Sequence, residues 1–202
     1  MKKITLITLF LLLIFFDAFT YAHNIQKEIA DNVIRLHVIA NSDDPADQEL
    51  KLKVRNAILA FMREKDYQNR EIAYTSIQST LPEIEKIAQD TIIQNGYQYS
   101  VKAELGEFDF PQKDYNNLSF PSGKYTALRI TIGQAVGHNW WCVMYPTLCF
   151  SDATIANETS VNTTQAEENL KASLSKESFA IISNHCELKF KIVDLFQSIF
   201  SN

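Results

Sequence analysis

The sequence is short of glycine, proline, cysteine and basic runs, and each shortage excludes a class of protein. Five glycines and five prolines in 202 residues exclude collagen-like and low-complexity chains. Three cysteines are too few for a small domain built on disulfides. The net charge of −5 argues against a general affinity for nucleic-acid phosphates. With 46% hydrophobic residues, the chain is expected to form one ordinary globular domain.

A long apolar run is present at the N-terminus. Lys2 and Lys3 precede residues 4–16, which carry no charge. A basic start before about thirteen apolar residues is typical of an export signal, and such a run is short for the ~30 Å hydrocarbon core. We therefore predict a signal peptide over 1–22, with cleavage after Ala22. The alternatives are an uncleaved membrane anchor and a buried N-terminal helix.

The spacing of apolar residues in the remaining chain predicts an α+β fold. Ile34, Leu36 and Val38 alternate with polar neighbours as in a strand, and Asp44 before Pro45 is a typical helix start. The expected elements are a helix over 24–32, a strand over 34–39, a helix over 45–64, a helix from Arg70 to Gly96 that restarts at Pro82, strands within 97–110, 125–132 and 140–150, and a C-terminal helix over 188–199.

Helices and strands are segregated in this order rather than alternating. Segregation favours a largely antiparallel sheet with helices packed on one face, in a single domain over 23–202. Residues 151–178 are polar, and we expect a loop there with one short helix around Leu170 and Leu174.

Export would place the cysteines in an oxidising compartment. Cys142 and Cys149 lie seven residues apart, and we predict a disulfide between them that closes a small loop and leaves Cys186 without a partner. The alternative is three free, buried cysteines.

No cofactor or metal motif is present in the sequence, and we predict neither. His138, Cys142 and Cys149 could hold a metal only with a fourth ligand. The alternative function is an exported cell-envelope hydrolase, with His138 as base, Cys142 as nucleophile and Asp152 as the orienting group.

Two adjacent tryptophans are the most informative local feature. Trp140 and Trp141 would point to opposite faces of a strand, so one of them faces away from a one-sided core. An exposed tryptophan beside a loop bordered by Gly137 is typical of a protein-binding hot spot. The alternative places both in a core. Arg35 and His37 share the polar face of the first strand, which we predict to be a solvated edge.

Several blocks of the chain resemble the stage II sporulation protein R family. They cover most of the exported part in one order, and the third is the most specific. The blocks are Ile34-Arg35-Leu36-His37-Val38-Ile39-Ala40-Asn41-Ser42-Asp43 with 47–55, residues 120–129, Gly133 through Gly137-His138-Asn139-Trp140-Trp141-Cys142-Val143 with 146–150, and residues 189–193.

This resemblance implies a signal made in the forespore of an endospore-forming bacterium. Members of the family are exported into the space between the two membranes. There they activate a membrane-embedded aspartic protease that processes the precursor of sigma factor E. The chain would then be a signalling protein and not an enzyme, working close to a membrane. The contact residues that we expect are His138, Asn139, Trp140 and Trp141, with Arg35 and His37 as secondary candidates.

Overall fold

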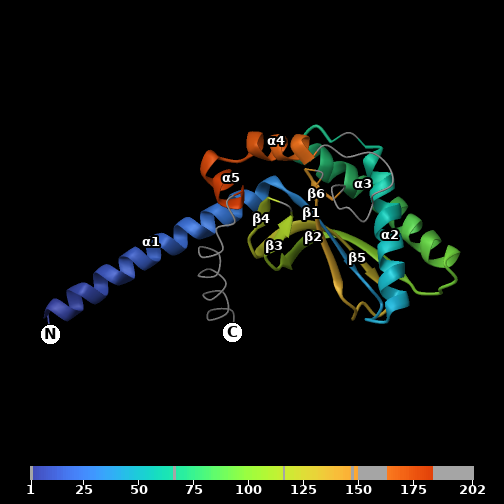
Figure 1. Cartoon of the computed structure of the whole chain (residues 1–202), viewed down its shortest axis with the longest axis horizontal. Coiled ribbons are helices and arrows are strands. Elements are labelled where there is room, and N and C mark those ends of the chain that lie inside the picture. Colours follow the sequence, from blue (N-terminus) through green and yellow to red (C-terminus); the bar gives the residue numbers. More distant parts are fainter. Residues whose placement is uncertain (1, 66, 116, 147, 150–162, 184–202) are drawn as a thin grey trace.

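The chain folds into a twisted sheet with helices on both of its faces, as a computed structural model shows (Figure 1). The structure describes residues 2–65, 67–115, 117–146, 148–149 and 163–183. The helices are α1 (Lys2–Asn32), α2 (Pro45–Arg63), α3 (Arg70–Gln94), α4 (Thr163–Ser173) and α5 (Lys176–Ser183). The strands are β1 (Ile34–Ile39), β2 (Val101–Phe110), β3 (Lys113–Tyr115), β4 (Leu118–Phe120), β5 (Gly123–Ile132) and β6 (Asn139–Tyr145).

The predicted α+β class is confirmed, and the main sheet is mixed. Within the described ranges its strand order is β2-β5-β1-β6. The pairs β2–β5 and β1–β6 are antiparallel, whereas β1 and β5 run parallel. The chain connects this parallel pair through α2, α3, β2, β3 and β4, which lie between β1 and β5 in the sequence and return the chain to the same end of the sheet. The short pair β3–β4 forms a second sheet.

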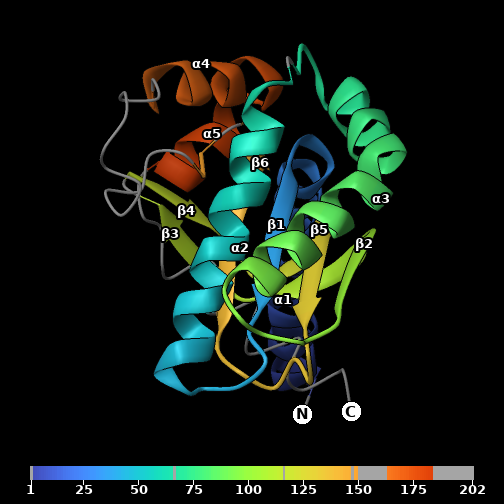
Figure 2. The same ribbon diagram turned by 90° about the vertical axis from the view of Figure 1, so that its right-hand side faces the viewer.

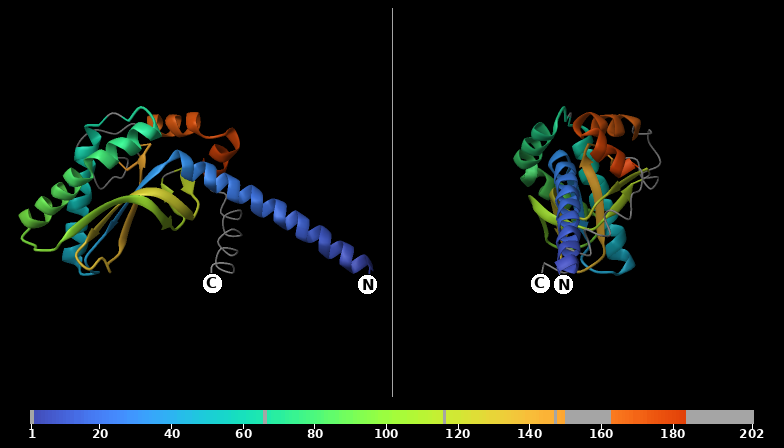
Figure 3. Two further views of the ribbon diagram at one scale, coloured as in Figure 1. Left: turned by 180° about the vertical axis from the view of Figure 1, so that it is seen from behind. Right: turned by 90° about the vertical axis from the view of Figure 1, so that its left-hand side faces the viewer.

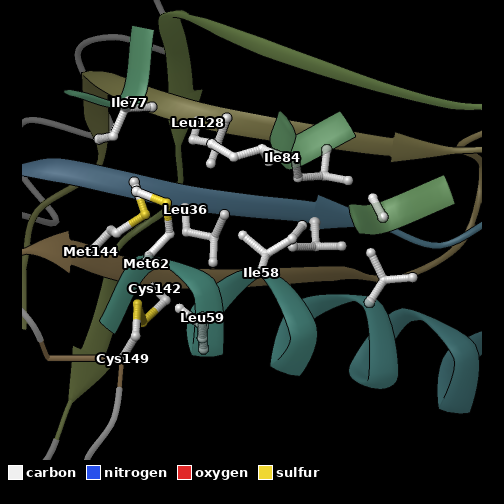
Figure 4. Packing of buried hydrophobic residues seen from close by; sticks show 14 of the residues in the cluster. Leu36, Ile58, Leu59, Met62, Ile77, Ile84, Leu128, Cys142, Met144 and Cys149 are labelled. Atoms are coloured by element: carbon white, nitrogen blue, oxygen red, sulfur yellow. A yellow bond between two sulfur atoms is a disulfide. The ribbon is translucent and has the colours of Figure 1, made fainter. Parts of the chain in front are cut away.

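Helices α2 and α3 cover one face of the main sheet. The Asp44 carboxylate accepts a hydrogen bond from the Ala46 N–H and caps α2, as predicted. Figure 4 shows Ile58 and Met62 of α2 directed toward Leu36 of β1. These side chains and their neighbours are buried, so this face holds the larger apolar core.

Helix α3 runs through Pro82, where the sequence predicts a restart. Thr80 does not cap a new helix: its hydroxyl donates to the carbonyl of Ser76, 2.7 Å away in the preceding turn. Proline removes one backbone hydrogen bond from a helix. Ile77 and Ile84, on either side of it, are both fully buried in the same core, and this packing keeps the helix continuous.

Helix α1 joins the apolar N-terminal run to the folded body without a break, whereas the sequence predicts a separate helix over 24–32. Its N-terminal part projects away from the body (Figure 3), and its apolar side chains from Ile4 to Phe16 are exposed. By length and composition α1 is apolar enough to cross a membrane, a property that it shares with export signals.

The sequence predicts helices on one face of the sheet, but the opposite face is also partly covered. Ile25 and Ile29 near the end of α1 are buried beside Phe120 and Ile182. The Glu28 carboxylate accepts hydrogen bonds from the hydroxyl of Ser178 at 2.6 Å and from the N–H of Ser175 at 2.6 Å, where α5 begins. These bonds, that of Ser178 first, lower the pKa of Glu28.

Part of the segment predicted as a loop is helical. Over 163–178 the chain forms α4 and the start of α5, and Leu170 and Leu174 are buried as the predicted short helix requires. Residues 150–162 lie outside the described ranges, and so do Asp152, Cys186 and the predicted C-terminal helix over 188–199.

The predicted disulfide is confirmed. Cys142 and Cys149 are bonded, with their Cα atoms 5.5 Å apart. Both residues are buried against the core under α2 (Figure 4). The bridge ties the middle of β6 to the turn that follows the strand.

Reduction of this bridge is expected to lower the free energy of unfolding by about 2–3 kcal/mol, because the unfolded chain regains the entropy of a small loop. Urea denaturation with and without a phosphine reductant measures the change. The double variant Cys142→Ala/Cys149→Ala is the control and should not respond to the reductant. An equal response of both proteins would contradict the expectation.

Candidate functional site

Two loops that are far apart in the sequence interlock at one end of the main sheet. One loop follows β1 at residues 40–44, and the other precedes β6 at residues 133–138; both lie at the lower end of the sheet in Figure 2, where α2 begins. The N–H of Gly137 donates to the carbonyl of Ala40 at 3.1 Å, and the N–H of Gln134 donates to the side chain of Asn41 at 2.9 Å. The two loops therefore form one unit.

Glycine is required at both ends of the second loop. A Cβ at Gly137 would lie 2.1 Å from the carbonyl oxygen of Ser42. Gly133 has a φ of +57°, and a Cβ there would lie 2.2 Å from the Asn41 side-chain oxygen. Only glycine permits so close an approach of the two backbones.

A buried carboxylate holds the first loop in shape. Asp47, in the first turn of α2, accepts hydrogen bonds from Asn41 at 2.7 Å and from Ser42 at 2.6 Å. Burial alone would raise the pKa of Asp47, but the bonds from Ser42 and Asn41 outweigh it and lower the pKa. Asn41 and Ser42 therefore support the site from beneath, in line with the helix-start role of this segment.

His138 is exposed on this unit and is held from two sides. Asp43 accepts from the backbone N–H of His138 at 2.6 Å and pairs with its ring Nδ1 at 2.5 Å, while 81% of the His138 side chain remains exposed. The bonds from His138 lower the pKa of Asp43. On the other side, the Lys51 ammonium donates to the carbonyl of His138 at 3.0 Å and to Gln48 at 2.6 Å.

The two tryptophans lie on opposite faces of β6, as predicted. The Arg55 guanidinium of α2 stacks 4.0 Å from the centre of the Trp140 ring. On the other face, Trp141 stacks on His37 at 3.7 Å between ring centres and meets the edge of Phe110 at 4.6 Å. Both rings are half-buried, so each is fixed by a neighbour and still presents part of its surface.

The prediction of a solvated edge at Arg35 and His37 is wrong. Strand β1 is a central strand between β5 and β6, and α1 with the β3–β4 pair covers its second face. Arg35 is fully buried, and its guanidinium lies 4.2 Å from the centre of the Phe110 ring and donates to the Tyr115 hydroxyl at 2.7 Å. Arg35 therefore cannot touch a partner directly, and it orders the aromatic layer beneath the site.

His37 is also buried, with 7% of its surface exposed. Its Nε2 lies 3.0 Å from the side-chain oxygen of Asn139. Burial lowers the pKa of His37 from 6.5 to about 4, against the opposing hydrogen bond to Asn139. The ring is therefore neutral at pH 7 and serves as the platform on which Trp141 stacks.

The structure does not assemble the hydrolase that the sequence left open. The Cys142 sulfur is bonded to Cys149 and is not available as a thiolate nucleophile. The same bond occupies both sulfurs of the hypothetical metal set with His138. The described ranges contain no group of three or more histidine, cysteine, aspartate or glutamate side chains that could hold a metal ion.

Asp43, Asp47 and Lys51 are site residues that sequence reasoning did not select. Asp43 and Asp47 belong to a segment that the sequence indicates as a helix start, and nothing there reveals contact with a loop about ninety residues away. Both loops lie in blocks that resemble the same family, 34–55 and 133–143. Their joint presence is the signal that could have suggested a contact between the two loops.

Known proteins match most of this chain. The sequence model of a family described as stage II sporulation protein R matches residues 30–155. The chain is also 37% identical over 163 residues to the stage II sporulation protein R of Bacillus subtilis (strain 168), which covers 75% of this chain and 73% of that protein. No solved structure matches the chain with statistical significance. The matched range contains both interlocking loops.

Acidification should destabilise the protein through His37. Its pKa is lower in the folded than in the unfolded state, so stability is full above pH 6.5 and falls as the unfolded chain takes up a proton. We expect about 2 kcal/mol of loss between pH 7 and pH 5 from this residue. Urea denaturation of the wild type and His37→Gln measures it, and equal pH slopes for the two proteins would contradict it.

Gly137→Ala should separate the two loops, because its Cβ would overlap the carbonyl of Ser42. We expect a loss of about 2 kcal/mol or more in the free energy of unfolding. Gly106→Ala is the matched control: its Cβ would meet only the Phe108 ring at 3.4 Å, and a change within about 1 kcal/mol is expected. Similar losses in both variants would argue against the interlock.

Proposed function

Because the chain belongs to the stage II sporulation protein R family, we propose that it is the exported signal that passes from the forespore to the mother cell during endospore formation. In this proposal it activates a membrane-embedded aspartic protease, which then processes the sigma-E precursor. The apolar part of α1 directs the chain out of the forespore and into the intermembrane space, close to the membrane that holds the protease.

The observation that carries the proposal is the exposed and rigidly held unit around His138. Asp43, Lys51 and Gly137 fix its backbone, while the imidazole and part of each tryptophan ring remain accessible. A surface of this kind loses little conformational entropy on binding, and aromatic residues dominate the energetics of many protein interfaces. These properties suit a binding surface.

A signalling protein activates its receptor only if it binds the active state more tightly than the inactive one. We assign this difference to contacts of His138, Asn139, Trp140 and Trp141. His37 and Arg35 support this surface from the buried side. His37 stacks on Trp141, and Arg35 packs against the Phe110 ring, which contacts Trp141. The disulfide between Cys142 and Cys149 closes the end of the same strand and reduces its freedom.

His138→Ala is expected to reduce processing of the precursor by about tenfold, the loss that a contact worth about 1.4 kcal/mol produces. The side chain is exposed, so the variant should keep the stability of the wild type. The measurement is co-expression of the chain, the protease and the precursor in a non-sporulating host, with the exported protein quantified alongside.

Lys86→Ala is the matched control, because Lys86 is an exposed residue on α3, outside this unit. It should leave processing unchanged. Trp141→Ala tests the aromatic contact in the same assay. If the precursor is processed normally with both His138→Ala and Trp141→Ala, at normal levels of exported protein, the assigned contact surface is wrong. If the precursor is processed equally without the wild-type chain, the proposed signalling function is wrong.

A further inference from the structure

Strand β2 forms an outer edge of the main sheet, where Figure 2 shows it beside β5 and below α3. It spans ten residues, Val101–Phe110, without a proline. It pairs with β5 along its whole length in one unshifted register, from Val101 opposite Ile132 to Phe110 opposite Gly123. A long, regular edge strand is a template for a further strand unless the protein blocks it.

The register determines which backbone groups of β2 point away from β5. The N–H of Gly133 donates to the carbonyl of Ser100 at 2.8 Å, so even-numbered residues of β2 exchange hydrogen bonds with β5. The odd-numbered residues turn their N–H and C=O groups outward. The N–H of Ala103 agrees with this alternation, because it donates to the Glu85 carboxylate of α3 at 2.9 Å.

The protein blocks its two sheet edges unequally. On the β6 edge, the N–H groups of Leu148 and Cys149 occupy the outward carbonyl of Val143, at 3.2 Å and 3.1 Å. On the β2 edge, the Glu85 carboxylate accepts a hydrogen bond from one outward group, the N–H of Ala103. For the outward backbone groups of Leu105, Glu107 and Asp109, no partner is found in the part of the chain that the structure describes.

We propose that residues 105–109 of β2 bind an extended segment of another protein as an added strand, with alternating basic and apolar side chains. This surface lies on the edge opposite β6 and does not depend on the proposed function. Three outward residues offer six backbone hydrogen-bonding groups, which is the usual source of affinity in strand addition.

The charges on β2 select the kind of segment. Glu107 and Asp109 are exposed on the same face of the strand; Asp109 pairs with Lys124 at 3.1 Å, and Glu107 has no ion pair in the described part of the chain. Basic residues opposite them would complete cross-strand pairs. On the other face, the half-buried Phe108 ring lies over Gly106, 3.4 Å from where a Cβ would stand, and the Arg129 guanidinium stacks on it at 4.0 Å. This partly exposed ring is an apolar surface beside the edge, and it suits apolar residues in between.

The same charges disfavour a second copy of this chain as the occupant. Two β2 strands related by a twofold axis would pair antiparallel. A register centred on Glu107 would place this carboxylate opposite its own copy, and like charges directly opposite each other are destabilising. A heterologous basic strand meets no such repulsion.

The test uses the full chain in nanodiscs of phosphatidylcholine, whose zwitterionic lipids do not attract a basic probe. The probe is a capped seven-residue peptide of alternating lysine and valine. At saturation it is expected to slow amide hydrogen exchange at Leu105, Glu107 and Asp109 by at least about tenfold. The matched peptide of alternating glutamate and valine should bind at least about tenfold more weakly. No slowing at these amides would overturn the proposal.

Glu107→Pro separates strand addition from simple charge attraction. The N–H of Glu107 points away from β5, so proline there costs no hydrogen bond of the sheet but blocks the added strand. We expect it to weaken peptide binding at least about tenfold, whereas Glu107→Thr, which keeps the N–H, stays within about tenfold of wild type and above the proline variant. If Glu107→Pro does not fold, a probe methylated at its β2-facing amides replaces it and should not bind.

Undiminished binding in Glu107→Pro, or of the methylated probe, would contradict strand addition. Slow exchange at the same amides without peptide, increasing with protein concentration, would show that a second copy occupies the edge and would overturn the basic partner.

Discussion

The contact between the Gly137 backbone and the loop after β1 is the constraint on which the candidate site depends. Without it, Asp43 and His138 would belong to separate loops at the end of the sheet. Because a Cβ at Gly137 would collide with Ser42, the close approach needs glycine and cannot be replaced by side-chain packing. The hydrogen bonds of Asp47 and Lys51 then stabilise what this approach brings together.

A second layer of interactions supports the same end of the sheet from within. Arg35 is fully buried among aromatic rings, and no carboxylate pairs with it among the residues that the structure describes, which makes burial of its charge costly. Its stacking on Phe110 and its bond to Tyr115 offset part of that cost. The stack continues through Phe110 to Trp141 and His37. The surface around His138 and Trp141 is thus held by a chain of rings rather than by an apolar core alone.

The two edges of the sheet differ for related physical reasons. The turn tied down by the disulfide places amide groups against Val143 and closes part of the β6 edge. On the β2 edge, the Glu85 carboxylate of α3 accepts a hydrogen bond from the N–H of Ala103 in the first half of the strand. In the two proposals, the rigid end of the sheet and the β2 edge are separate surfaces for protein partners.

The sequence by itself determined the local elements. Strand alternation at 34–39, the Asp44 cap and the opposite directions of Trp140 and Trp141 follow from short-range rules, and the family could be inferred from its blocks. The spacing of Cys142 and Cys149 favoured a bridge but left free cysteines open, and the structure decided between them. Only the tertiary structure decided that β1 is central, that Arg35 and His37 are therefore buried, and that Asp43 meets His138. Alternation shows that two residues share a face of a strand; whether another layer covers that face depends on elements distant in the chain, here α1 and the β3–β4 pair.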